Sequence, residues 1–231
     1  MFATIKQIFS PKNKDLQKRI LFTFAALFIF KLGTAIVVPG IDQASLGTKN
    51  MGFLELIDVM GGGALSNFSI FALGVSPYIT ASIIIQLLEM DIVPYLAELS
   101  KQGGTGRAKL NQITRITGII LAFIQGYMFS FTFLGNGTVM DYMLFSLVLT
   151  AGTCFVLWLG DQITAKGIGN GISMIIMAGI ISSMPNMFKT AFSGFIGNSG
   201  NIIGIIMFAL YVIVYLAIII GIIYVQSAER R

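Results

Sequence analysis

The stretch that decides the fold is GGGALSNFSIFALGVSPYITASIIIQLL, residues 61–88. It opens on three glycines and continues as an apolar run that small and polar residues interrupt: Ser69, Ser76, Pro77, Thr80, Ser82 and Gln86. A lipid-facing helix avoids such residues, because an unpaired polar group in hydrocarbon costs free energy. Pro77 favours a kink, and residues 63–69 are too few to cross a bilayer. The stretch predicts a short segment folded back to membrane depth and then a broken spanning helix, with an ordinary kinked helix in a bundle as the equal alternative.

The composition is that of a membrane protein. Of 231 residues, 55% are hydrophobic and only 11% are charged, and the mean hydropathy is +0.85, far from soluble averages. The chain has no His and a single Cys, Cys154, which excludes an internal disulfide and disfavours a Cys/His metal site or a His-based triad. We therefore expect no cofactor, no metal and no enzymatic activity. The net charge of +5 fits basic cytoplasmic loops better than a nucleic-acid surface.

Hydropathy predicts six spanning helices, since each crossing needs about 20 apolar residues. Besides the broken helix within 61–88, the predicted spans are residues 20–38, 113–134, 142–159, 172–187 and 202–225. Loops are predicted at 40–60, 89–112, 135–141 and 185–201. Residues 1–19 form a basic leader whose apolar side chains share one face, which suits a helix lying on anionic lipids. Lys31 lies inside the first span and is expected to snorkel toward the far interface, because Pro39 and Gly40 end the helix soon after.

The distribution of Lys and Arg predicts the orientation. Most basic residues fall on one side of the predicted alternation, at positions 6, 12, 14, 18, 19, 101, 107, 109, 115, 166, 230 and 231. Only Lys49 and Lys189 fall on the opposite side. The positive-inside rule then places both ends of this chain in the cytoplasm.

Five collinear stretches resemble the SecY family, the channel subunits of the bacterial protein translocon. They are KLGTAIVVPGID (31–42), GGALSNFSIFALGVSPYITASIIIQLL (62–88), LAELSKQGGTGRAKLNQITR (96–115), WLGDQITAKGIGNGIS (158–173) and IIMAGI (175–180). The resemblance implies two pseudo-symmetric halves of five helices around an hourglass pore. Residues 20–190 resemble the first half, and 191–231 a sixth helix and the start of a cytoplasmic loop. The expected fold is an all-α, SecY-like membrane bundle of six transmembrane helices with a short re-entrant plug helix.

The resemblance also implies roles for individual residues. The plug, which closes the external funnel, is expected at about 61–71 and includes Gly61, Gly62, Gly63, Ala64, Leu65, Ser66, Asn67 and Phe68. The pore ring matches Val75, Ile79, Ile172 and Ile176. Each pair is spaced i, i+4 and so projects from one helical face, and aliphatic side chains offer water and ions no hydrogen bonds. Packing in a core or against lipid is the alternative for all four.

Two further groups follow from the same resemblance. Thr80 and Gln125 match the polar cluster of the lateral gate, through which signal sequences leave for the lipid. Arg107, Lys109 and Arg115 fall in a cytoplasmic basic loop, where the charge suits ribosomal RNA or an acidic motor surface. Positive-inside topology alone explains these three cations equally well.

The function implied is that of the channel-forming subunit of the Sec translocase in the bacterial cell membrane. Such a subunit passes unfolded polypeptides and releases signal or membrane segments sideways. The implied partners are SecE, SecG, SecA or a translating ribosome, the signal peptide or nascent polypeptide, anionic lipids and the missing C-terminal half of the channel. We expect the chain to need that half, in cis or in trans, in order to conduct.

Two alternatives remain for the function. One is a truncated, non-conducting fragment. The other is a secondary transporter, which also uses broken helices. Transporters usually bury an ionisable residue near the midplane to couple ions, and the middles of the second, third and fifth predicted spans contain no Asp, Glu, Lys or Arg.

Overall fold

The computed structural model describes residues 14–38, 58–59, 61–90, 92–134, 137–196 and 202–227. The predictions for the leader up to residue 13, for the external segment at 39–57 with Lys49, and for residues 228–231 lie outside the described residues. The chain divides into two compact units, Met1–Ser182 and Ser183–Arg231, and each is described by itself.

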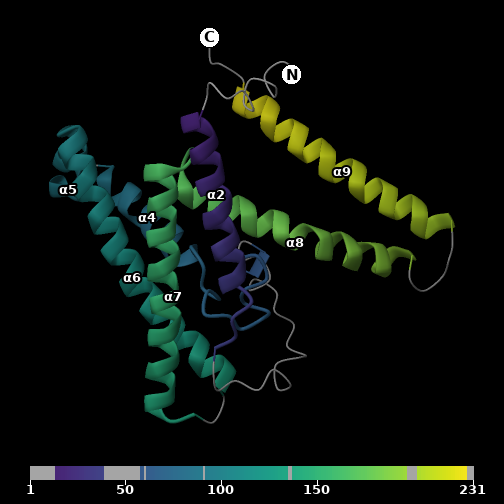
Figure 1. Ribbon diagram of the computed structural model, residues 1–231, viewed down its shortest axis with the longest axis horizontal. Helices are drawn as coiled ribbons and strands as arrows, with labels where there is room; N and C mark the ends of the chain where they lie inside the picture. Colours follow the sequence, from purple (N-terminus) through teal and green to yellow (C-terminus); the bar gives the residue numbers. More distant parts are fainter. Residues whose placement is uncertain are drawn as a thin grey trace. The chain divides into compact units, whose positions relative to one another are not determined.

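The all-α prediction is confirmed, because helices carry nearly all of the described chain and the single bridge found there is isolated. The helices labelled in Figure 1 are α2 (Lys14–Gly33), α4 (Ser76–Glu89), α5 (Pro94–Lys101), α6 (Gly104–Leu134), α7 (Val139–Lys166), α8 (Gly171–Ile196) and α9 (Ile202–Ser227). Proline stands in the first turn of both α4 and α5, where its missing N–H costs nothing. A capping box between Thr138 and Asp141 begins α7.

Four stretches are long and apolar enough to cross a membrane: Gly104–Phe131, Val139–Lys166, Gly171–Phe195 and Gly204–Ser227. Helices α4 and α5 together form a fifth candidate, bent by 93° at their junction. Helix α2 has 20 residues, the length of a span, but charged side chains crowd its first turns and Lys31 lies near its end. Of the six predicted spans, α2 thus matches by length rather than by apolar character.

Several predicted helix ends are wrong. Helix α6 begins at Gly104 and not at residue 113, so Arg107 and Lys109 lie on a helix and the predicted basic loop is much shorter. Helix α7 continues to Lys166, and α8 continues through Pro185 to Ile196, where a loop was predicted. Hydropathy marks only the part of a helix that suits hydrocarbon, and these helices extend beyond that part with polar turns.

The prediction of a short re-entrant helix is also wrong, because residues 61–75 form consecutive turns and no helix. These residues are named the turn segment below. The backbone φ angles are positive at Gly62 (72°), Gly63 (83°), Phe68 (47°) and Gly74 (54°). A right-handed helix contains no such residues. Glycines at 62, 63 and 74 allow the positive φ angles that these turns require.

The chain after α2 anchors the turn segment. Val37 and Ser69 form an isolated antiparallel bridge. On its two sides, the Val38 N–H donates to the Phe68 carbonyl at 2.8 Å and the Ile70 N–H donates to the Ile36 carbonyl at 3.0 Å.

Within the first unit, α2 and α7 lie side by side and run in opposite directions (Figure 1). The start of α2 and the end of α7 line one hollow of about 360 Å³, which Lys18, Arg19 and Lys166 help to form. The Thr23 hydroxyl accepts the Ile168 N–H at 3.1 Å just after α7. Lys31, near the end of α2, therefore lies at the opposite end of this helix pair from Lys166.

In the second unit, aromatic rings join the last part of α8 to α9. Phe188 meets Tyr215 at 5.7 Å between ring centroids, and Phe192 meets Phe208 at 5.4 Å, both edge to face. The apolar window of α9 is otherwise 0% buried within the structure. Such a helix must be covered by lipid or by another protein.

Candidate functional site

An apolar cluster joins the turn segment to α2, α7 and α8. Its buried members include Ala64 and Val75 from the turn segment, which are 0% and 7% exposed. Ile79 of α4 and Ile172 and Ile176 of α8 are partly buried and pack against it. All four residues of the predicted ring are therefore brought to one place, together with Ala64 and Phe71 of the predicted plug.

Local hydrogen bonds orient the two i, i+4 pairs of the predicted ring. Val75 directly precedes α4, and the Ile79 N–H donates to the Val75 carbonyl at 3.1 Å. The i, i+4 relation therefore holds although Val75 itself stands outside the helix. Asn170 Oδ1 accepts the N–H groups of Ile172 (3.0 Å) and Ser173 (3.3 Å). This side-chain cap satisfies donors that the first turn of α8 leaves free.

Glycines bring α7 and α8 close together at this point. A Cβ added to Gly171 would lie 1.9 Å from the Gly160 carbonyl oxygen. A Cβ added to Gly160 would lie 3.1 Å from Cγ1 of Ile172. The glycine contact thus seats Ile172 directly against α7.

The predicted plug residues divide by exposure. Gly61, Gly62, Ala64, Leu65 and Phe68 are buried, Gly63 is half-buried, and Ser66 and Asn67 are exposed. A Cβ on Gly62 would lie 3.1 Å from Cα of Gly179 in α8. The turn segment therefore turns its apolar side inward and its polar tip outward.

Two charged side chains contact the turn segment. Lys31 is exposed near the end of α2, and its Nζ donates to the Gly62 carbonyl at 3.1 Å; its snorkelling to a membrane interface stays a prediction. Asp58 Oδ1 accepts the N–H groups of Leu65 at 2.8 Å and Ser66 at 2.9 Å. Sequence reasoning missed both contacts.

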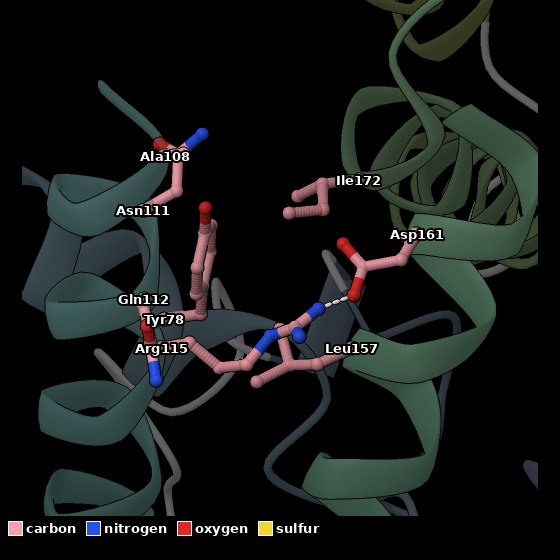
Figure 2. A pocket seen from close by; sticks show the side chains of 8 residues that line it. All are labelled: Tyr78, Ala108, Asn111, Gln112, Arg115, Leu157, Asp161 and Ile172. Carbon is pink, nitrogen blue, oxygen red and sulfur yellow. Dashed lines mark ion pairs between the residues drawn. The ribbon is translucent and has the colours of Figure 1, made fainter. Parts of the chain in front are cut away.

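A polar pocket of about 350 Å³ borders the cluster. Figure 2 shows side chains converging on it from four helices: Tyr78 of α4, Ala108, Asn111, Gln112 and Arg115 of α6, Leu157 and Asp161 of α7, and Ile172 of α8. The Arg115 guanidinium forms an ion pair with the Asp161 carboxylate across the pocket (Figure 2). Ile172 lies both in this pocket and against the apolar cluster, so the pocket leads directly to the predicted ring.

The residues predicted for the lateral gate and for the basic loop do not form a common cluster with the predicted ring. The Thr80 hydroxyl donates to the Ser76 carbonyl of its own helix at 3.2 Å, and Gln125 is half-buried on α6. Among the described residues no hydrogen bond joins Thr80 to Gln125. Arg107 and Lys109 are exposed on α6, whereas Arg115 is paired. The sequence pattern assigned no role to Asp161, although an ionisable residue so close to an apolar run was an available signal.

These features define a polytopic α-helical membrane protein whose apolar cluster lies beside irregular backbone. Two solved structures share the fold. One is described as Sec61 in the canine ribosome-channel complex from the endoplasmic reticulum and the other as the structure of a protein conducting channel. Each has a TM-score of 0.52 and 20% identity, and each match covers 80% of this chain and 39% of the other.

The family is shown by sequence. The family model described as SecY matches residues 69–231. The protein translocase subunit SecY of Bacillus subtilis (strain 168) is 46% identical over 244 residues, and that of Staphylococcus aureus (strain NCTC 8325 / PS 47) is 44% identical over 242. Both matches cover 100% of this chain and 56% of the relative. The chain belongs to the SecY family, and it spans 56% of the length of these curated relatives.

Proposed function

We propose that the chain forms part of the wall of a protein-conducting channel in the bacterial cell membrane. The observation that carries this proposal is the convergence of Val75, Ile79, Ile172 and Ile176 on one apolar cluster. Two of these residues come from the end of irregular backbone and the start of α4, and two from α8. The relatives are named as subunits of a protein translocase, which agrees with the proposal.

The physical role of the cluster is to form a seal. Aliphatic side chains do not bind water or ions, and hydrophobic constrictions close by dewetting. An extended polypeptide fits between such side chains because they yield sideways without breaking hydrogen bonds. The turn segment acts as the plug, with Ala64 and Leu65 buried at 0% and 1% exposure. No chemical step is required of the chain itself.

The polar surroundings suit the remaining roles. Residues 61–88 contain no charged side chain, so the plug moves without carrying an ion into hydrocarbon. Thr80 and Gln125 are proposed as the polar residues of a lateral gate, where intramembrane hydrogen bonds cost about 0.6 kcal/mol on average to break. Arg107 and Lys109 are exposed and available to a ribosome or an acidic motor.

The proposed partners are SecE, SecG, SecA or a translating ribosome, together with the signal peptide or nascent polypeptide that passes through. Anionic lipids are a further proposed partner, because Lys18, Arg19 and Lys166 gather around one hollow and basic clusters attract anionic headgroups. Both ends of the chain are proposed to be cytoplasmic, from the Lys and Arg distribution.

Photocrosslinking of a stalled secretory polypeptide tests the channel proposal. Benzoylphenylalanine replaces Ile79 or Ile172 in the chain, kept in the membrane of cells that make it. The matched control replaces Leu147, which is 52% exposed on α7 and outside the apolar cluster. We expect crosslinks to the polypeptide from positions 79 and 172 and none above background from 147. Equal yields at all three positions would contradict the proposal.

A further inference from the structure

The turn segment is held from two sides by side chains of opposite charge that it does not itself contain. Lys31 donates to the Gly62 carbonyl at 3.1 Å. Asp58 accepts from the amides of Leu65 (2.8 Å) and Ser66 (2.9 Å), and its second oxygen accepts the Ser66 hydroxyl. We propose that Lys31 and Asp58 are the positioning residues of the turn segment: they latch it onto the apolar cluster, and it detaches as a unit when their contacts break.

The contacts of Lys31 and Asp58 with the turn segment are stronger than ordinary neutral hydrogen bonds, because each involves a charged group. Hydrogen bonds in which one partner is ionised are roughly twice as strong as neutral ones. The Lys31 ammonium donates to a carbonyl, and the Asp58 carboxylate accepts from two amides. Each charge therefore contacts the end of the peptide dipoles in residues 62–66 that has the opposite partial charge. Within the described residues neither Lys31 nor Asp58 forms an ion pair. The Lys31 side chain contacts the backbone of the turn segment, and the Asp58 side chain contacts its backbone and the Ser66 hydroxyl.

The backbone hydrogen bonds of residues 61–66 are local: the N–H groups of Gly62 and Gly63 donate to the carbonyls of Val59 at 3.2 Å and Asp58 at 2.9 Å. Ala64 and Leu65 are 0% and 1% exposed, but burial of apolar side chains is non-directional. The antiparallel bridge holds the segment only later, at Ser69. The Lys31 hydrogen bond therefore ties residues 61–66 to α2, and the Asp58 side chain adds directional contacts to these local backbone bonds.

Lys31 and Asp58 both lie outside the turn segment, so the turn segment can move without carrying a charge. Lys31 is fixed on α2 and Asp58 precedes the segment, while residues 61–88 carry no charge. When the segment leaves, both charges stay behind without their partners, and that loss favours the return of the segment. The latch rests on geometry alone, but its meaning for gating rests on the channel function proposed above.

Alkylation of a buried cysteine tests the latch. In a Cys154→Ala background, Leu65→Cys places a buried thiol in the turn segment. Cysteine is smaller than leucine, so the substitution introduces no steric clash. The purified protein in detergent micelles is treated with N-ethylmaleimide, and the labelling rate is measured. Adding Lys31→Met or Asp58→Asn should raise the rate about tenfold, which is the change in opening equilibrium for one lost hydrogen bond to a charged group. Lys31→Arg keeps the donor and should stay near the parent rate.

Two controls separate the latch from a general loss of structure. Lys189→Met removes an exposed lysine of α8 outside the first unit and should leave the rate unchanged. Thr153→Cys, in the same Cys154→Ala background, replaces a residue that is 0% exposed on α7 and reports opening of the bundle. Unchanged labelling at position 65 in both Lys31→Met and Asp58→Asn would overturn the proposal, and so would an equal rise at position 153.

A second measurement avoids the cysteine in the turn segment. Hydrogen exchange of the otherwise unmodified chain should speed up at the amides of Leu65 and Ser66 in Asp58→Asn, and exchange in α7 should not change. Neither experiment needs a translocating polypeptide. The latch proposal can therefore be refuted while crosslinking from positions 79 and 172 still supports the channel proposal. The channel proposal can likewise be refuted while the latch is supported, so the two are tested separately.

Discussion

Gly152 offers a sharp test of how the turn segment packs on α7. A Cβ added there would lie 1.8 Å from the Ile70 carbonyl oxygen and 2.8 Å from its carbonyl carbon. Ordinary van der Waals contact begins at 3.4 Å, so in Gly152→Ala the two backbones must separate by about 1.6 Å. Backbone atoms cannot avoid the clash by changing rotamer.

The size of the effect follows from the surroundings of Ile70. Overpacking of this kind costs about 1–3 kcal/mol. The Ile70 N–H is tied to the Ile36 carbonyl at 3.0 Å, so the shift also strains a hydrogen bond worth about 1 kcal/mol. Helix propensity acts the other way and favours Ala over Gly by about 1 kcal/mol. We expect Gly152→Ala to lower the free energy of unfolding by about 1–3 kcal/mol.

The assay is unfolding by sodium dodecyl sulfate in mixed micelles, followed by circular dichroism and by fluorescence of Trp158, the one tryptophan of the chain. The Trp158 ring lies 5.6 Å from Phe155, which in turn stacks on Phe71 of the turn segment at 5.7 Å. The control is Gly221→Ala in α9, where nothing lies within 4 Å of the added Cβ, so propensity acts alone and stability stays equal or rises. If Gly152→Ala matched or exceeded the parent in stability, the close approach of α7 and Ile70 would be refuted.

Two further outcomes are expected. The Arg115–Asp161 pair has side chains 44% and 45% exposed, so a double-mutant cycle with Arg115→Met and Asp161→Asn should give a coupling of only about 0.2–1 kcal/mol; a coupling above 3 kcal/mol would mean a dry, buried pair. Asp141→Asn should lower the free energy of unfolding by about 1 kcal/mol, because the carboxylate accepts the Thr138 N–H at 2.8 Å in the capping box that begins α7. The same unfolding assay measures it, with the exposed Asp15 changed to Asn on α2 for comparison.

Hydropathy was sufficient to place most of the helices, because a long apolar run in this composition has few alternatives. It failed at the helix ends, since polar turns such as those with Arg107 and Lys109 continue a helix once its hydrogen bonds have started. It failed for the turn segment because Gly62, Gly63 and Phe68 reverse the backbone in response to distant contacts with α8 and with the chain after α2. Local propensity contains no information about those contacts.

The same distinction applies to the site. The four residues of the predicted ring could be paired from the sequence, because i, i+4 spacing fixes a helix face, and the resemblance assigned the two pairs to one ring. The contacts of Lys31 with Gly62 and of Arg115 with Asp161 join residues far apart in sequence. An ionisable residue inside an apolar helix does signal that a partner exists. It does not say which one, and for Lys31 the partner is a backbone carbonyl, which sequence patterns cannot reveal.

In the proposed channel, the positions of these charges would keep the closed constriction easy to open. Lys31 lies near the end of α2, whereas Asp161 lies near the end of the antiparallel α7, so the two sets of polar contacts flank the apolar cluster from opposite ends of this helix pair. Between them the cluster itself holds aliphatic and aromatic side chains, which exclude water but resist displacement in no particular direction. Directional contacts come from the hydrogen bonds at its edges, which include those of Lys31 and the backbone bonds beside the Val37–Ser69 bridge. Each such bond is worth little in net free energy. In the proposed channel, a few of them would therefore make the closed arrangement specific and still allow their exchange for contacts with a translocating polypeptide.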